Sequence, residues 1–196
     1  MLRGMVFVDH MNFDIALQSY YKSLEKHSPK LDYNCLFKEI VSLVSNVDYL
    51  KTFIFVPKPD DFLMKDKNLL QHYKWASGLA NSKYIDVIEG RYIARPVSGD
   101  ASTMDITNRN TYYKVEKGTD INLAIHALSK AHFNSYDVAF VISGDTDYIS
   151  VYKQLKSMGK IVVVIGVKGQ VLGKIVPEVD DFKLIDDNLF NKCLRK

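Results

Sequence analysis

Cysteine is nearly absent from the sequence, since only Cys35 and Cys193 among the 196 residues carry a thiol. The two lie far apart and form no Cys-x-x-Cys pair, so neither a disulfide framework nor a zinc knuckle is predicted. We therefore expect a reducing, cytoplasmic location, with Cys35 buried in the core and Cys193 in the C-terminal tail.

The sequence also lacks a long apolar run. The longest runs, around 138–142 and 161–167, fall far short of the roughly 20 residues that a membrane-spanning helix needs. The apolar stretch 5–8 stops at Asp9, so no secretory signal is visible. No membrane partner is expected.

An excess of charge of one sign is missing as well. The chain has 26 Lys and Arg against 23 Asp and Glu, a formal charge of +3, with 47% hydrophobic residues. This composition is typical of a soluble globular protein and excludes general disorder. The length suits one domain over residues 1–196. The near-neutral balance neither demands nor excludes a nucleic-acid partner, because basic residues could gather on one face.

Apolar runs alternate with helical patterns along the chain. Strands are predicted over residues 4–9, 50–56, 84–89, 111–115, 137–142, 160–165 and 182–185. Helices are predicted from 12 or 14 to 26, and over 33–47, 66–79, 120–132, 145–158 and 170–175, with Thr119 as the cap of the helix at 120. The strands have no polar face, which favours an α/β fold, a three-layer α/β/α sandwich with a mostly parallel central sheet. Loop composition around residues 90–110, strongest over 95–105, predicts an exposed loop or insertion there.

Acidic side chains stand at the ends of three of these segments. Asp9 ends the first strand, with Asn12 three residues on. SGDTD (143–147) follows the strand at 137–142, and KGTD (117–120) opens a helix. Open parallel sheets bind ligands outside the carboxyl ends of their strands, and neighbouring strands lie about 5 Å apart. We therefore expect these carboxylates to meet at one edge of the sheet.

Carboxylates at such spacing favour a divalent cation, because they repel one another unless a cation neutralises them. Hard oxygen ligands with room for water select Mg²⁺ or Mn²⁺ over zinc. Such an ion lowers the pKa of a bound water and neutralises charge on phosphate oxygens. A single aspartate after a strand is mostly a turn or helix-cap residue, so the prediction depends on the joint occurrence of these aspartates.

Three motifs in this order resemble the NYN domain family, the LabA-like branch of the PIN-like nucleases. They are FVDHMN (7–12), KGTDINLA (117–124) and VISGDTDY (141–148), and GKIVVVIG (159–166) is also similar to the family. The resemblance covers nearly the whole chain and is weakest over 57–110. It implies a PIN-like α/β/α fold and a divalent-metal-dependent endoribonuclease that hydrolyses RNA phosphodiesters with metal-activated water.

The resemblance also implies roles for single residues. It makes Asp9, Asp120 and Asp145 the metal-binding carboxylates, with Asp147 as an additional ligand or water-orienting group. Asn12 becomes a polar residue at the rim of the catalytic site. The implied catalytic set is therefore Asp9, Asn12, Asp120, Asp145 and Asp147.

Two histidines depart from the family pattern. His10 stands where glycine is common, and His126 stands where many members carry a further aspartate. Six residues at 100° per residue place His126 about 120° around the helix from Asp120, which favours the packing side over the metal side. His10 either contacts the substrate or is a solvated loop residue.

Basic and aromatic residues interleave between residues 91 and 117, an arrangement that suits single-stranded nucleic acid. The alternative is that the rings belong to the core and the charges to a solvated face. Lys117 is the leading phosphate contact because it lies three residues from Asp120. The expected substrate-binding set is Lys117, Ser143, His10, Arg95 and Lys114, with Ser143 also fixing the Asp145 loop through its hydroxyl.

Two other functions compete with an RNA-cleaving enzyme. His10 and His126 motivate a catalytically weak RNA-binding or interaction module that retains the fold. The same carboxylates could also serve a small-substrate phosphohydrolase, although neither a P-loop nor a dinucleotide fingerprint is present. A homo-oligomer formed through the middle region is left open.

Overall fold

The computed structural model describes residues 1–195 and is built on a central sheet. Within these residues the sheet has seven strands in the order β4-β3-β2-β1-β5-β6-β7, and only β4 is antiparallel to its neighbour. The strands are β1 (Leu2–Asp9), β2 (Val47–Pro59), β3 (Ile85–Pro96), β4 (Tyr112–Lys117), β5 (Val138–Ile142), β6 (Ile161–Val167) and β7 (Asp181–Ile185).

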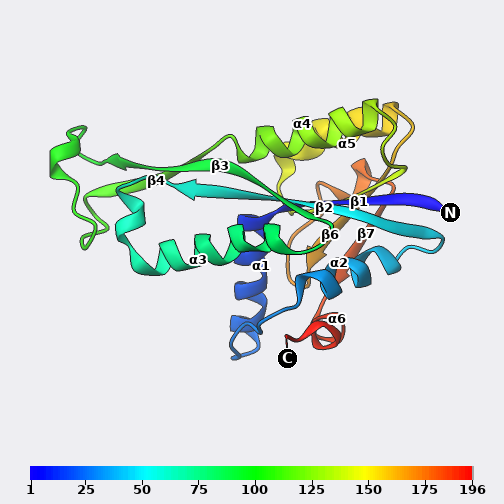
Figure 1. Cartoon of the computed structure of the whole chain (residues 1–196), viewed down its shortest axis with the longest axis horizontal. Helices are drawn as coiled ribbons and strands as arrows, with labels where there is room; N and C mark the ends of the chain where they lie inside the picture. The colour runs from blue at the N-terminus through cyan, green and yellow to red at the C-terminus, as the bar shows by residue number, and fades with distance from the viewer. Residues whose placement is uncertain (196) are drawn as a thin grey trace.

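Helices cover both faces of this sheet (Figure 1). One face carries α1 (His10–Ser23), α2 (Tyr33–Ser42), α3 (Lys67–Gly78) and the short α6 (Asp187–Phe190), and the other carries α4 (Thr119–His132) and α5 (Ile149–Ser157). The predicted three-layer α/β/α sandwich with a mostly parallel sheet is thus confirmed. Within residues 1–195, no helix is both long enough and apolar enough to cross a lipid bilayer.

Alternate side chains of β1 supply both layers of the core. Val6 and Val8 belong to the cluster under α1 and α2, whereas Met5 and Phe7 belong to the cluster under α4 and α5. Phe7 is fully buried and stacks on Phe53 of β2 at a centroid distance of 5.6 Å. A strand buried on both faces has no polar side, which is why the sequence shows it as one apolar run.

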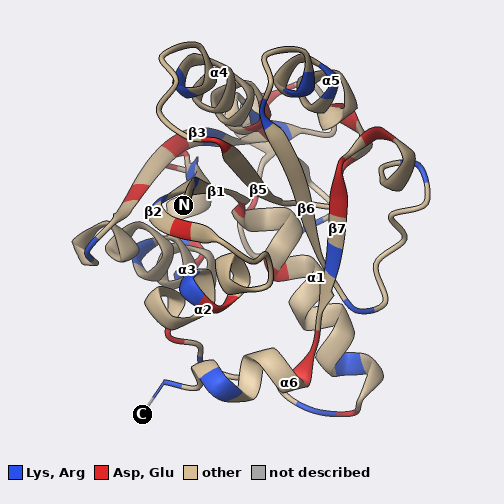
Figure 2. Cartoon of the chain, turned by 90° about the vertical axis from the view of Figure 1, so that its right-hand side faces the viewer, with Lys and Arg blue, Asp and Glu red and all other residues tan. Residues whose placement is uncertain are grey.

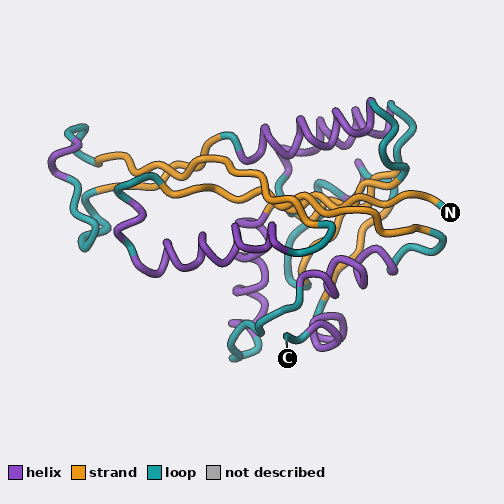
Figure 3. Tube along the Cα trace, viewed as in Figure 1, coloured by secondary structure: helices purple, strands orange, loops and turns teal. Residues whose placement is uncertain are grey.

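Strands β2, β3 and β4 continue far beyond the end of β1 and project from the body of the molecule (Figures 1 and 3). We call the projecting part, residues 57–59, 90–96 and 112–117, the arm. A small separate core forms there, in which Ala94 and Tyr112 of the arm are buried together with Leu63 of the 3₁₀ turn that follows β2. The expected loop at 90–110 is accordingly shorter, because β3 runs on to Pro96 and the connection to β4 occupies only 97–111.

Prolines 57 and 59 do not end β2, contrary to the expectation that the strand stops at residue 56. β1 ends opposite Phe55, so one side of β2 is a free edge beyond that point. Proline is tolerated on a strand edge because its missing N–H has no ladder partner to satisfy there.

Three local predictions around the helices are wrong. Residues 170–175 form turns in place of a helix. Gly118, with φ of 82°, is the residue before α4, and the expected side-chain cap from Thr119 is not made. The helix expected over 145–158 is divided into a 3₁₀ turn η4 (Thr146–Tyr148), capped by Asp145, and α5.

The prediction for the cysteines is also wrong, because Cys35 and Cys193 form a disulfide with Cα atoms 5.4 Å apart. The C-terminal segment returns to α2, where the Asp32 N–H donates to the Cys193 carbonyl at 2.8 Å. Cys193 is fully buried, whereas Cys35 is only half-buried. Two thiols separated by 158 residues are brought together by the tertiary fold alone, so spacing could not reveal the pair.

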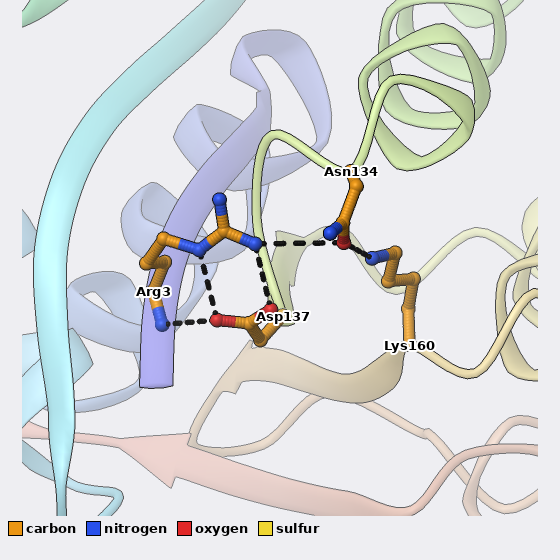
Figure 4. A network of polar contacts seen from close by, with 4 residues as sticks. All are labelled: Arg3, Asn134, Asp137 and Lys160. Carbon is orange, nitrogen blue, oxygen red and sulfur yellow. Dashed lines mark hydrogen bonds and ion pairs between the residues drawn. The ribbon is translucent and has the colours of Figure 1, made fainter. Parts of the chain in front are cut away.

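A polar network closes the end of the sheet that lies away from the acidic residues (Figure 4). Arg3 donates through its backbone N–H and its guanidinium to Asp137, with a 2.9 Å ion pair. Lys160 donates to the Asn134 side-chain oxygen at 2.6 Å. The hydrogen bonds from Arg3 lower the pKa of Asp137 to about 2.

We predict that Arg3→Gln lowers the free energy of unfolding only slightly at pH 7, because the ion pair is partly exposed. Asp137 has a lowered pKa in the folded state, so its contribution is complete above its ordinary pKa near 3.8 and is lost as the pH falls toward 2. Urea unfolding of both proteins should therefore show a difference that shrinks between pH 4 and pH 2. A difference that is constant over this range would contradict the assignment.

Candidate active site

The expected meeting of acidic segments occurs at the carboxyl ends of β1 and β5. The two strands are parallel neighbours, with Val8 opposite Ile142. Asp9 follows directly and is only 5% exposed. Asp120 lies in the first turn of α4, and Asp145 caps η4 immediately after β5.

Asp9 is held by groups from two segments. One carboxylate oxygen accepts the Asn12 backbone N–H at 3.1 Å, and the other accepts the Ser143 hydroxyl at 3.2 Å. The same Ser143 oxygen accepts the Asp145 N–H at 3.1 Å. Ser143 is 1% exposed, so its hydroxyl fixes the Asp145 loop as expected and is enclosed by protein.

Asn12 connects three segments through its side-chain oxygen. That oxygen accepts the Gly144 N–H at 2.8 Å and the Gln170 amide at 3.1 Å. Gln170 in turn accepts the Val167 N–H at 2.8 Å. Asn12 therefore positions the loop that carries Asp145. The sequence suggested only that Asn12 lies at the rim of the site.

The electrostatics show that the carboxylates lie close to one another. Burial raises the pKa of Asp9, and the charges of Asp120 and Asp145 raise it further. The pKa of Glu116, near the end of β4, is also raised. Burial is the largest cause, and the charges of Asp9, Asp120 and Asp145 raise it further. Glu116 was not among the sequence candidates and is a fourth acidic residue of this cluster.

Tyr148 lies between two of these carboxylates. Its hydroxyl donates to Asp120 at 2.9 Å, and its oxygen lies 3.4 Å from the Asp9 carboxylate. Burial and then the three aspartate charges raise the pKa of Tyr148 far above its ordinary value, so the hydroxyl keeps its proton and remains a donor. The phenol thus joins β1 to the start of α4.

The side chain of Asp147 lies outside the acidic cluster. It is exposed, and the contact it makes there is from its backbone N–H to the Asp145 carboxylate at 2.9 Å. The side chains gathered at the edge are therefore Asp9, Asp120 and Asp145 of the expected set, together with Glu116.

The donor set suits a hard divalent cation by its chemistry, since it consists of carboxylates whose mutual repulsion a cation would relieve. However, no three His, Cys, Asp or Glu side chains among residues 1–195 converge closely enough to hold a metal ion. The acidic residues lie near one another, but their side chains are not close enough together to ligate one metal ion.

The two unusual histidines have different surroundings. His126 packs between the rings of Phe53 and Phe55, at centroid distances of 5.8 and 5.6 Å, on the packing side of α4. His10 is 1% exposed and lies against His72 and Trp75. The interpretation of His10 as a solvated loop residue is wrong, because β1 leads directly into α1 and buries it in the first turn.

The expected substrate contacts are divided between the two faces of the arm. Lys114 pairs with Ala94 and Lys117 with Arg91 in the β3–β4 register, so Lys114 shares the face of Glu116, while Arg95 and Lys117 share the other. In the view of Figure 2, backbone segments with Lys and Arg are intermixed with segments that carry Asp and Glu.

The fold and the sequence were both compared with known proteins. The fold is similar to the crystal structure of a protein of unknown function, VPA0982, from Vibrio parahaemolyticus RIMD 2210633, with a TM-score of 0.55 and 18% identity. The alignment covers 95% of this chain and 94% of that one. No curated protein resembles the chain closely enough in sequence to count as a match. The sequence profile of the NYN domain matches residues 3–186, nearly the whole chain, and the chain therefore belongs to the NYN domain family.

Proposed function

We propose that this protein is a divalent-metal-dependent endoribonuclease with its active site at the carboxyl ends of β1 and β5. The observation that carries the proposal is the assembly of Asp9, Asp120 and Asp145 from three separate segments, close enough for two of them to raise the pKa of the third. Membership of the NYN domain family, whose members are generally nucleases, supports the same reaction class.

In this proposal Asp9, Asp120 and Asp145 are the metal-binding carboxylates, and Glu116 is a further acidic group beside them. A bound Mg²⁺ or Mn²⁺ would activate a water for attack and neutralise charge on the phosphate. Ser143 and Asn12 act as positioning residues, because one orients Asp9 and Asp145 and the other holds the Gly144 backbone. Tyr148 keeps Asp9 and Asp120 together through its hydroxyl.

The finer parts of the assignment belong to the same proposal. They are RNA as the substrate, the LabA-like branch, and one domain over the whole chain. A cytoplasmic location is retained as a prediction from the sequence, although the Cys35–Cys193 disulfide is more typical of oxidising compartments.

The test is cleavage of labelled single-stranded and structured RNAs in Mn²⁺, Mg²⁺ and EDTA by wild type and Asp145→Asn. We expect cleavage in either metal, none in EDTA, and none in the variant. Asp48→Asn is the matched control, because Asp48 is an exposed aspartate at the start of β2, the opposite end of the sheet. Metal-dependent cleavage that survives in Asp145→Asn would overturn the proposal.

Two observations favour a second candidate, a catalytically weak RNA-binding module. The acidic side chains do not converge to ligating distances, and Tyr148 already bridges Asp9 and Asp120. This candidate predicts that RNA binds but is not cleaved in any metal. Turnover of a small phosphate ester in place of RNA would instead indicate a phosphohydrolase built on the same carboxylates.

A further inference from the structure

A groove with a volume of about 400 Å³ lies between α1, α3 and the arm. Its walls include Ile15 and His10 from α1, His72 from α3, and Tyr92 and Lys114 from the arm. Figure 1 shows why this space exists: β2 to β4 run past the end of β1, and α3 returns beneath them.

Two residues of the groove wall are neighbours of the acidic cluster in the chain. His10 in its wall directly follows Asp9 in the sequence. On β4, Lys114 and Glu116 are two residues apart and point to the same face, roughly 7 Å from each other. Lys114 therefore lines the groove and also lies on the same face of β4 as a member of the acidic cluster.

The chemistry of the groove suits a base more than a run of phosphates. Lys114 lies 5.7 Å from the centre of the Tyr92 ring, so a cation and an aromatic face stand together. The basic residues Lys114 and Arg109 are balanced by Asp14 and Asp66, which also line the groove. Its net charge is therefore near zero, whereas a channel for several phosphates would be basic.

His10 supplies an unused polar group in this wall. Its imidazole is almost completely buried, and its Nε2 has no hydrogen-bond partner within residues 1–195. The hydrogen-bonding edge of a base is a partner for such a nitrogen.

We propose that this groove receives one unpaired nucleotide of a single-stranded RNA, next to the phosphate at the acidic cluster. The inference deepens the proposed function and rests on it. In this proposal Tyr92 supplies a face for stacking, and Lys114 and Arg109, which line the groove, supply cations for the adjoining phosphates. A duplex binds less well, because a base must first leave its pair and its stack.

The test measures binding without catalysis. The Asp145→Asn protein in EDTA is titrated into a labelled single-stranded RNA and into the same RNA annealed to its complement, with fluorescence anisotropy as the readout. Two further substitutions, Lys114→Gln on the arm and Ile15→Glu on α1, are each added to this background. Both side chains line the groove from opposite walls, and Ile15 is 57% exposed, so the fold tolerates its replacement.

We expect each groove variant to bind single-stranded RNA on the order of 10-fold more weakly, because Lys114→Gln removes a phosphate contact and Ile15→Glu places a negative charge in the groove. Ile125→Glu is the matched control for Ile15→Glu, because Ile125 is also 57% exposed but lies on α4. Lys83→Gln, an exposed lysine at the opposite end of the sheet, is the control for Lys114→Gln. Both controls should stay within about twofold of the background protein.

Any one of three results would contradict the proposal that the groove binds a nucleotide. They are equal affinity for the single strand and the duplex, equal losses of affinity in the groove variants and their controls, or no RNA binding. The outcome is separate from that of the nuclease proposal, because no metal is present. If the groove variants weaken binding as expected while the wild type never cleaves RNA in Mn²⁺ or Mg²⁺, the nucleotide-binding proposal is supported and the nuclease proposal is contradicted.

Discussion

Asp9→Asn should abolish metal-dependent RNA cleavage while leaving the protein folded and about as stable as the wild type. Loss of a group that only supports a metal ligand costs 10–100-fold in metal affinity or activity, so loss of a proposed ligand should cost more than about 100-fold. Stability is different, because Asp9 is buried among Asp120 and Asp145, whose charges oppose its ionisation. Asparagine removes that repulsion and can still accept the Asn12 N–H.

The measurement pairs cleavage rates with urea unfolding in EDTA, for wild type, Asp9→Asn, Asp145→Asn and the double variant. We expect the free energy of unfolding of Asp9→Asn to stay within about 1 kcal/mol of wild type, since relief of repulsion offsets the weakened contact to Ser143. The double variant should be no less active than either single variant, because residues that act as one unit are not additive. Additive losses would show that the two aspartates act separately.

The sequence predicts the central strands and the acidic edge well because both depend on local information. β1 and β5 are apolar runs that end in polar residues, and parallel pairing then requires their ends to meet. The placement of Asp9 beside Asp145 follows from this rule alone. His126 likewise follows from helical geometry, and it packs on the phenylalanines of β2 as expected.

The features that the sequence misses depend on partners distant in the chain. The stretch at 170–175 has helical spacing, but Gln170 is held by Val167 and Asn12, and the chain turns there. The sequence does not identify Glu116, because this residue joins the acidic cluster only when β4 lies antiparallel beside β3. Its position four residues before Asp120, at the end of a short strand pattern, was the available signal. The disulfide of Cys35 and Cys193 had no local signal.

Gly90 ties the arm to the proposed active site, and its replacement should be the most damaging conservative change in β3. A Cβ atom at Gly90 would lie 2.9 Å from the backbone nitrogen of Thr119 and 3.1 Å from the Lys117 carbonyl oxygen, and it would collide with the Thr119 hydroxyl. Backbone atoms cannot rotate away as a flexible side chain can. The start of α4, which carries Asp120, must therefore move.

Gly90→Ala should lower the free energy of unfolding by about 1–3 kcal/mol, the usual effect of overpacking. It should also slow cleavage on the order of 100-fold, because a displacement of about 1 Å at a catalytic group has that effect. Gly173→Ala is the matched control, since nothing lies within 4 Å of the new methyl group there. Cleavage is compared well below the melting temperature of each protein, so that loss of fold and displacement of Asp120 can be separated. A folded Gly90→Ala protein with the wild-type rate would show that the reaction does not require the position of Asp120, and Asp120 would then leave the proposed site.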